Sequence, residues 1–340
     1  MSFSAKRVLK SPGIVSCTAA IVAFYLFFCY LPSGQVVHGQ SPEAHTDVVD
    51  VHHLPLGDGK ISDAPRRGYV MSCMTEFRGR GAQNAGPWIH GTTWDLTEKM
   101  QVQGRVMWPE AVFRITPQAN GRVVSRILDG NGLPVDTPTG TFPIGYDDPA
   151  FEIDRNPNSI LAQDVALTLP PNPQLAAEPS CVPMGMIGIA LNGVAIYNAL
   201  DDAGRDAVAH EVQDLCNGHP QVQGQYHYHG PSPCLPNETA KETLVGYAID
   251  GFGIYSMYDA QGHELSDTDL DECHGRTSPV TWDGSQVNMY HYVLTREYPY
   301  TVGCFRGAPV HTQRPSRRGR MGPPPGMRGG PPPYGPPPNF

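Results

Sequence analysis

The sequence predicts a mainly β domain, a disulfide-stapled sandwich or barrel-like fold that contains an internal tandem repeat. The first observation is the content of 37 Gly and 35 Pro in 340 residues, which suits tight turns and short strands more than long helices. The second is a pair of similar segments in the second half of the chain. The third is a set of six cysteines that follows an apolar N-terminal segment.

The first 35 residues are typical of a membrane-targeting segment. Three basic residues precede an uncharged run of 18 residues, Ile14–Leu31, which just reaches the length of a spanning helix. We therefore expect residues 1–35 to be either an uncleaved signal anchor or a cleaved signal peptide. Both alternatives place the rest of the chain outside the cytoplasm, anchored to the membrane in the first case and secreted in the second.

The rest of the chain divides into a linker at 36–65, a β domain at 66–307 and a disordered tail rich in Pro, Gly and Arg at 308–340. The chain has 24 Lys and Arg against 33 Asp and Glu, and its two ends are basic. The domain between them is therefore strongly acidic. Because an acidic body repels phosphate backbones, we exclude nucleic acid as its partner.

An internal repeat organises the second half of the domain. The segment Ala190–Tyr197 corresponds to Ala248–Tyr255 at an offset of 58, and Tyr-His-Tyr at 226–228 corresponds to Tyr-His-Tyr at 290–292 at an offset of 64. The order of these landmarks is the same in both halves, which indicates a tandem duplication. The two copies cover about residues 186–235 and 244–305.

Each copy is expected to fold as a hairpin, a loop, a cysteine and then a Tyr-His-Tyr strand. The hairpins are predicted from Asn192-Gly193 and Asp250-Gly251, which lie between short apolar runs and are typical of two-residue type I′ turns.

The cysteines predict three disulfides and an oxidising compartment. An even number of cysteines in an exported domain implies that they are paired. The Cys-x-x-Cys spacing that is typical of zinc sites does not occur. Cys216 and Cys273 are equivalent in the repeat, and each is followed by one cysteine beyond its Tyr-His-Tyr strand. We therefore predict the pairs Cys216–Cys234, Cys273–Cys304 and Cys73–Cys181. A glycosylation sequon at Asn237 fits the same exported setting.

The candidate chemistry lies in the segment Tyr226-His227-Tyr228-His229. Side chains alternate between the two faces of a strand, so His227 and His229 share one face and can converge on a metal ion. Three further histidines lie near this segment in the sequence and are candidate ligands: His219, His274 and His291. If the two Tyr-His-Tyr strands meet at a pseudo-twofold axis, His227 and His291 contribute to one site as symmetry mates. Imidazole ligands with few carboxylates suit Zn or Cu.

Asp250 and the segment 210–214 are two further candidate sites. Asp250, in the second hairpin turn, is a candidate carboxylate ligand or base. The segment His210-Glu211-Val212-Gln213-Asp214 is similar to a zinc-protease helix motif, but Asp214 stands where the second histidine belongs, which disfavours a protease.

Four segments resemble the YHYH protein family: Asp214–Pro220, Gly224–His229, Leu244–Phe252 and Leu270–Gly275. Two more, Gly91–Asp95 and Asp154–Asn158, resemble segments of its longer members. The likeness covers roughly residues 70–307. The resemblance implies an exported domain named for its motif, and it implies no reaction, because the family has no established activity to transfer.

Two hypotheses of different classes follow. In the first, the domain binds a transition metal; a closed His site would be structural, and three His with an open position would permit a metal-bound hydroxide and hydrolysis. In the second, the His/Tyr network is purely structural and the domain is a secreted or membrane-tethered interaction module. Whether the protein is an enzyme, and which substrate or partner protein it meets, stay open at this point.

Overall fold

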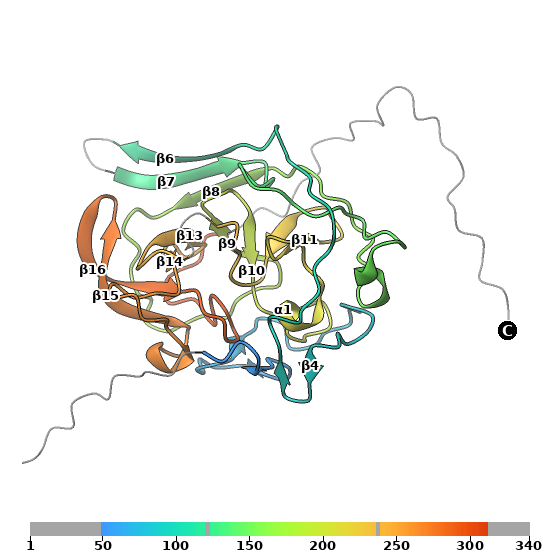
Figure 1. The fold of residues 1–340 in the computed structure, drawn as a ribbon. Coiled ribbons are helices and arrows are strands. Elements are labelled where there is room, and N and C mark those ends of the chain that lie inside the picture. Colours follow the sequence, from blue (N-terminus) through green and yellow to red (C-terminus); the bar gives the residue numbers. More distant parts are fainter. Residues whose placement is uncertain (1–48, 120–122, 236–238, 312–340) are drawn as a thin grey trace, which may run out of the picture. The chain divides into compact units, whose positions relative to one another are not determined.

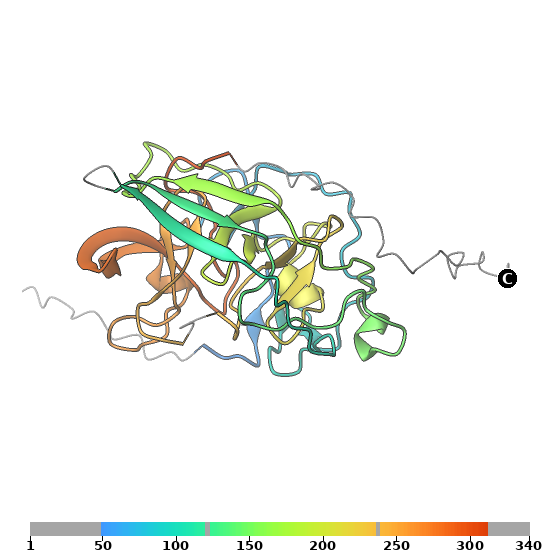
Figure 2. The same ribbon diagram turned by 90° about the horizontal axis from the view of Figure 1, so that it is seen from above.

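The computed structural model describes residues 49–119, 123–235 and 239–311 (Figure 1, and Figure 2 after a turn of 90°). The expected membrane segment, the sequon at Asn237 and the tail beyond residue 311 lie outside the described residues. Within the described ranges, no helix is both long enough and apolar enough to cross a bilayer.

A central eight-stranded sheet displays the internal repeat in its strand order, β11-β12-β10-β9-β13-β14-β16-β15. Copy one supplies β9 (Met186–Ala190), β10 (Ala195–Tyr197), β11 (Gly218–Pro220) and β12 (Tyr226–Tyr228). Copy two supplies β13 (Leu244–Ala248), β14 (Gly253–Tyr255), β15 (Gly275–Trp282) and β16 (Ser285–Val293). Equivalent strands lie at equal distances from the two edges, so a pseudo-twofold axis passes between β9 and β13, which pair antiparallel.

The same axis keeps the two Tyr-His-Tyr strands apart. Four strands of the sheet lie between β12 and β16. Each Tyr-His-Tyr strand pairs in parallel with the second strand of its own hairpin, β12 with β10 and β16 with β14. The expectation that these strands meet in one site is therefore wrong: His227 and His291 are equivalent residues in two separate places.

The two hairpin turns also differ from the expected type. Gly193 N–H donates to the carbonyl of Ala190, and Gly193 is the residue of this turn with a positive φ, 86°. The turn is therefore a three-residue connection that ends in a left-handed glycine, not a two-residue type I′ turn. Asn192 keeps a negative φ, and from there its side chain donates to the hydroxyl of Tyr228 at 3.0 Å. The second hairpin repeats the pattern, with φ 94° at Gly251.

A three-stranded sheet covers the central sheet and makes the fold a sandwich (Figures 1 and 2). Its order is β6 (Phe113–Ala119), β7 (Val123–Gly130) and β8 (Val165–Leu169). Arg126 of β7 joins the two layers, because its guanidinium lies 4.8 Å from the ring centroid of Tyr247 and 4.5 Å from that of Trp282. The mainly β fold class is confirmed, as a sandwich without a closed barrel.

Smaller elements surround these sheets. β1 (Leu54–Pro55), β5 (Thr93–Trp94) and β4 (Ile89–His90) form one small sheet, and β2 (Ile61–Ser62) pairs with β3 (Val70–Met71). Two of these strands lie within the stretch expected to be a linker, so that stretch contributes to the fold. The helical elements are short: η1 (Pro149–Glu152), α1 (Ala207–His210) and η2 (Asp267–Asp269).

Three disulfides join the described chain, with the pairing that the repeat predicts: Cys73–Cys181, Cys216–Cys234 and Cys273–Cys304. The first closes a separation of 108 residues and ties the N-terminal part of the domain to the repeat. In the loop-entropy account, removing such a bond costs about 2–5 kcal/mol.

A buried aspartate organises the approach to each Tyr-His-Tyr strand. The carboxylate of Asp214 accepts hydrogen bonds from the backbone of Cys216 and Gly218 and, at 2.9 Å, from the hydroxyl of Tyr226. In copy two, Asp271 accepts a hydrogen bond from the hydroxyl of Tyr290 at 3.1 Å. Each aspartate thereby holds the segment before β11 or β15 against the strand that carries Tyr-His-Tyr.

Removing the hydroxyl of Tyr292 measures how much such a buried Tyr–Asp hydrogen bond contributes to stability. Tyr292 donates to Asp250 at 2.6 Å and accepts from the backbone N–H of Arg306 at 2.8 Å. We expect Tyr292→Phe to lower the free energy of unfolding by about 1.5–3 kcal/mol, because it leaves a buried carboxylate short of a donor. Chemical denaturation measures this change. Tyr146→Phe is the control: Tyr146 is 73% exposed, and a change above about 0.5 kcal/mol there would contradict the assignment of the cost to burial.

Candidate metal centre

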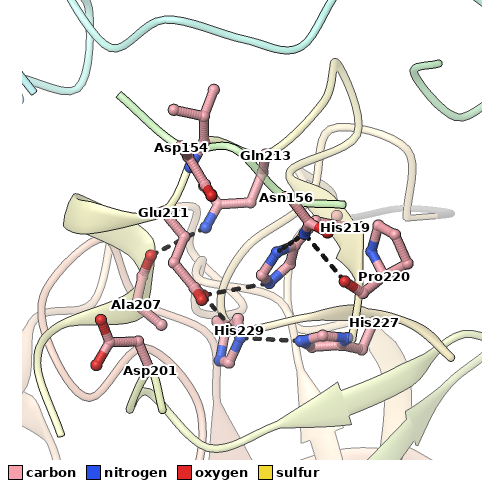
Figure 3. A network of polar contacts seen from close by, with 12 residues as sticks. Asp154, Asn156, Asp201, Ala207, Glu211, Gln213, His219, Pro220, His227 and His229 are labelled. Carbon is pink, nitrogen blue, oxygen red and sulfur yellow. Dashed lines mark hydrogen bonds and ion pairs between the residues drawn. The ribbon is translucent and has the colours of Figure 1, made fainter. Parts of the chain in front are cut away.

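Three of the predicted histidines lie together in copy one. His219 on β11 and His227 on β12 are direct cross-strand partners, and His229 follows β12 immediately. Their side chains are buried, with 4%, 2% and 3% of each residue exposed. One ligand nitrogen of each ring lies within 4.8 Å of the others, so this cluster could hold a metal ion (Figure 3).

Hydrogen bonds orient two of these imidazoles and determine which nitrogen carries the proton. Nδ1 of His227 lies 3.1 Å from the carbonyl oxygen of Gln225, and Nδ1 of His229 lies 2.5 Å from that of Asn198. A carbonyl can only accept, so both Nδ1 atoms must donate a proton. In the neutral rings, each Nε2 then presents a lone pair. The two Nε2 atoms lie 3.0 Å apart, so their lone pairs repel each other unless a proton or a metal ion lies between them.

Burial makes a proton a poor candidate for that cation at neutral pH. Burial, and then the charge of His229, holds the pKa of His227 well below its usual range. Burial lowers the pKa of His229 to about 4. The pKa of His219 is likewise well below its usual range, because of burial and of its two imidazole neighbours. Neutral imidazole is the form that binds a metal.

Glu211 completes the cluster and was missed by the sequence argument. It follows α1, whose N-terminus is capped by the side chain of Asp206, and its backbone is extended, so the chain turns there toward the histidines. Oε2 of Glu211 lies 3.3 Å from Nε2 of His219 and 3.5 Å from Nε2 of His229 (Figure 3). This oxygen is buried and has no hydrogen-bond partner in the described part of the chain. The signal in the sequence was the acid beside His210, which we had dismissed with the incomplete protease motif.

Three of the donor separations in this group are close to those of tetrahedral coordination. In a tetrahedral zinc site with bonds of about 2.0–2.1 Å, two donor atoms lie about 3.4 Å apart. The separations His227–His229, His219–Glu211 and His229–Glu211 are 3.0 Å, 3.3 Å and 3.5 Å. The three histidines are the group whose ligand atoms all lie within 4.8 Å of one another.

The charges around the cluster also leave room for a divalent cation. Lys99 is buried, its ammonium donates to Gln213, and burial lowers its pKa to about 7. The negative charges of three nearby carboxyls oppose this shift and raise the pKa of Lys99: Asp206, Glu211 and Asp154. Asp201 and Arg205 also act on Glu211, so the acids of this group outnumber its basic side chains. Burial, and then the charges of Asp154 and Asp201, raises the pKa of Glu211 well above its usual range, and a nearby cation would lower it.

His219 has a different outer partner from the other two histidines. Nδ2 of Asn156 lies 3.3 Å from its Nδ1 and also donates to the carbonyl oxygen of Pro220 at 3.0 Å (Figure 3). An amide N–H donates, so Nδ1 of His219 accepts, and without a metal its proton sits on Nε2, facing Glu211. For a neutral His219 to bind a metal through Nε2, its proton must move to Nδ1, which then no longer accepts from Asn156.

The other predicted site residues lie in copy two with partners of their own. His274 lies 3.2 Å from Asp267 and 2.9 Å from the hydroxyl of Thr295. His291 donates from Nδ1 to the carbonyl of Met289 at 3.1 Å, and Asp250 accepts from Tyr292. The structure thus brings together three of the five predicted histidines, and it places Asp250 in the support of the second hairpin.

The arrangement can bind a cation more readily than it can turn over a substrate. Three imidazoles, each at most 4% exposed, could hold a metal ion, and Glu211 lies beside two of them, His219 and His229. Closed sites of this kind are structural, whereas catalytic zinc keeps one position for water or substrate.

Comparison with known proteins identifies one family. The family model described as YHYH protein matches residues 166–265, from β8 through the opening hairpin of copy two. The curated proteins give no match, and neither do the solved structures. The matched segment contains Tyr226-His227-Tyr228-His229 and Glu211, so the part of the chain that is similar to this family includes the strand that carries two of the clustered histidines.

Proposed function

We propose that the protein binds one transition-metal ion in a buried site, through His219, His227 and His229, with Glu211 as the fourth ligand. One observation carries the proposal: the Nε2 atoms of His227 and His229 face each other at 3.0 Å while both Nδ1 atoms donate to carbonyls. Three nitrogens and one oxygen suit Zn or Cu. The ion would join β11, β12 and the end of α1, and its role in the closed site is structural.

We further propose that the domain works outside the cytoplasm, either secreted or held at a membrane by residues 1–35. Three disulfides support this proposal, because such bonds persist in oxidising compartments. The alternative, an interaction module with a metal-free His network, draws on the 3.3 Å contact between His219 and Glu211, in which the Nε2 proton of a neutral His219 faces the carboxyl. Metal content separates the two readings.

The first test is the metal content of the untagged chain, produced through an oxidising export pathway and measured by mass spectrometry. We expect about one Zn or Cu per chain, lost in His227→Ala/His229→Ala because two of four donors are removed. His291→Ala is the matched control: it removes the equivalent imidazole from copy two and should leave the ion bound. A folded wild-type chain that contains no metal and takes up neither Zn nor Cu would leave only the interaction module.

The second test concerns the carboxylate. Glu211→Gln keeps the size of the side chain and removes its charge, so we expect metal affinity to fall at least about tenfold. Competition with a chromophoric chelator measures the change. Glu297→Gln serves as control, since Glu297 is a carboxyl with a pKa also raised by burial, and it contacts Asp267 in copy two. Equal affinities for the Glu211→Gln variant and the wild type would remove Glu211 from the ligand set.

The third test is stability with and without metal. An ion that binds only the folded state stabilises it by about 2.7 kcal/mol when its free concentration is one hundred times Kd. We expect a chelator to lower the melting temperature of the wild type and to leave that of His227→Ala/His229→Ala unchanged. A chelator effect of the same size in both proteins would show that it acts elsewhere.

A further inference from the structure

The pseudo-twofold axis provides a counterpart for each proposed metal ligand. In copy one, Gly218 pairs with Tyr228 and His219 pairs with His227. In copy two, Gly275 pairs with Tyr292 and Arg276 pairs with His291. Continuing along the strands, Val293 takes the place of His229. We call Arg276, His291 and Val293 the second-copy position.

The shared histidine is held in the same way in both copies. His291 donates from Nδ1 to the carbonyl two residues earlier at 3.1 Å, as His227 does at 3.1 Å. A tyrosine of the neighbouring strand packs on each ring, stacked for His227 on Tyr197 at 3.8 Å between centroids and edge-on for His291 on Tyr255 at 4.9 Å. The backbone and the outer hydrogen bond of a ligand are therefore present in copy two.

The second-copy position is closely packed and carries acids. It borders a small pocket, without room for a water molecule, that is lined by Tyr255, Glu242, Asp259, Arg276, His291 and Val293. What it lacks is nitrogen donors, because Arg276 and Val293 replace two imidazoles. The guanidinium also brings a fixed positive charge next to His291, which repels a metal cation.

We infer that copy two retains the framework of a second metal centre, and that Arg276 and Val293 are the two side chains that close it to metal. The inference rests on the ligand geometry of the proposed function. It predicts one metal per chain in nature and two when both positions carry imidazoles. Arg276 supplies to this half of the sheet the positive charge that the ion supplies to the other half.

The test is the metal content of the full chain carrying Arg276→His/Val293→His. We expect the ratio of Zn or Cu to protein to rise by about one over the wild type after dialysis against a weak chelator. Arg276→Gln/Val293→Gln, which removes the same charge and adds side chains that are poor ligands, should show no rise. A folded His variant, judged by its near-ultraviolet circular dichroism, with an unchanged ratio would overturn the inference.

A second arm separates this inference from the proposed function. Arg276→His/Val293→His in the background of His227→Ala/His229→Ala should bind one ion, at copy two alone. If the wild type binds none and this quadruple variant binds one, the proposed function fails and the inference stands. If the double His variant does not fold, Arg276→His alone places two imidazoles across β15 and β16. Copper titration should then show one added site, and its absence would overturn the inference.

Discussion

The antiparallel pairing of β9 with β13 is the contact on which the rest of the domain depends. The two strands can lie this close because glycines stand at the equivalent positions 188 and 246. A Cβ at Gly188 would lie 2.8 Å from the carbonyl oxygen of Tyr247, and one at Gly246 would lie 2.7 Å from that of Ile189. With the first strands of both copies joined at the centre, each hairpin and each Tyr-His-Tyr strand must extend outward. One contact thus sets both the eight-stranded order and the separation of the two histidine positions.

This separation allows the two copies to diverge without a conflict between them. Both keep what the sheet needs: an Asx-type residue in the hairpin turn bonded to a tyrosine, an aspartate bonded to the other tyrosine, and a disulfide. The face that carries His227 or His291 differs between the copies. The tyrosines of the motif therefore belong to the packing of the fold, and the histidines, which point to the opposite face of the strand, are free to acquire a separate role.

Much of this fold could be predicted from the sequence because repeats and cysteines are local signals that report on distant contacts. The duplication predicts two hairpins, two Tyr-His-Tyr strands and the three disulfide pairs. It could not predict how the copies meet, because that depends on whether the first or the last strands of the copies pair. The expected meeting of His227 with His291 was wrong for this reason. Glu211 reaches the cluster from the end of a helix, and Asn156 reaches it from a loop. No periodicity or motif in the sequence predicts either contact.

In the proposed site, burial favours a metal ion over a shared proton. A buried imidazole pair with both Nδ1 atoms committed to carbonyls can share a proton only if one ring becomes a cation, and burial lowers the pKa of both rings. The same burial raises the pKa of Glu211 and opposes its charge. A metal resolves both conflicts together: it binds neutral imidazoles through their lone pairs and gives the carboxylate a positive partner. In copy two the conflict never arises, because Val293 removes the second lone pair and Arg276 already provides the cation.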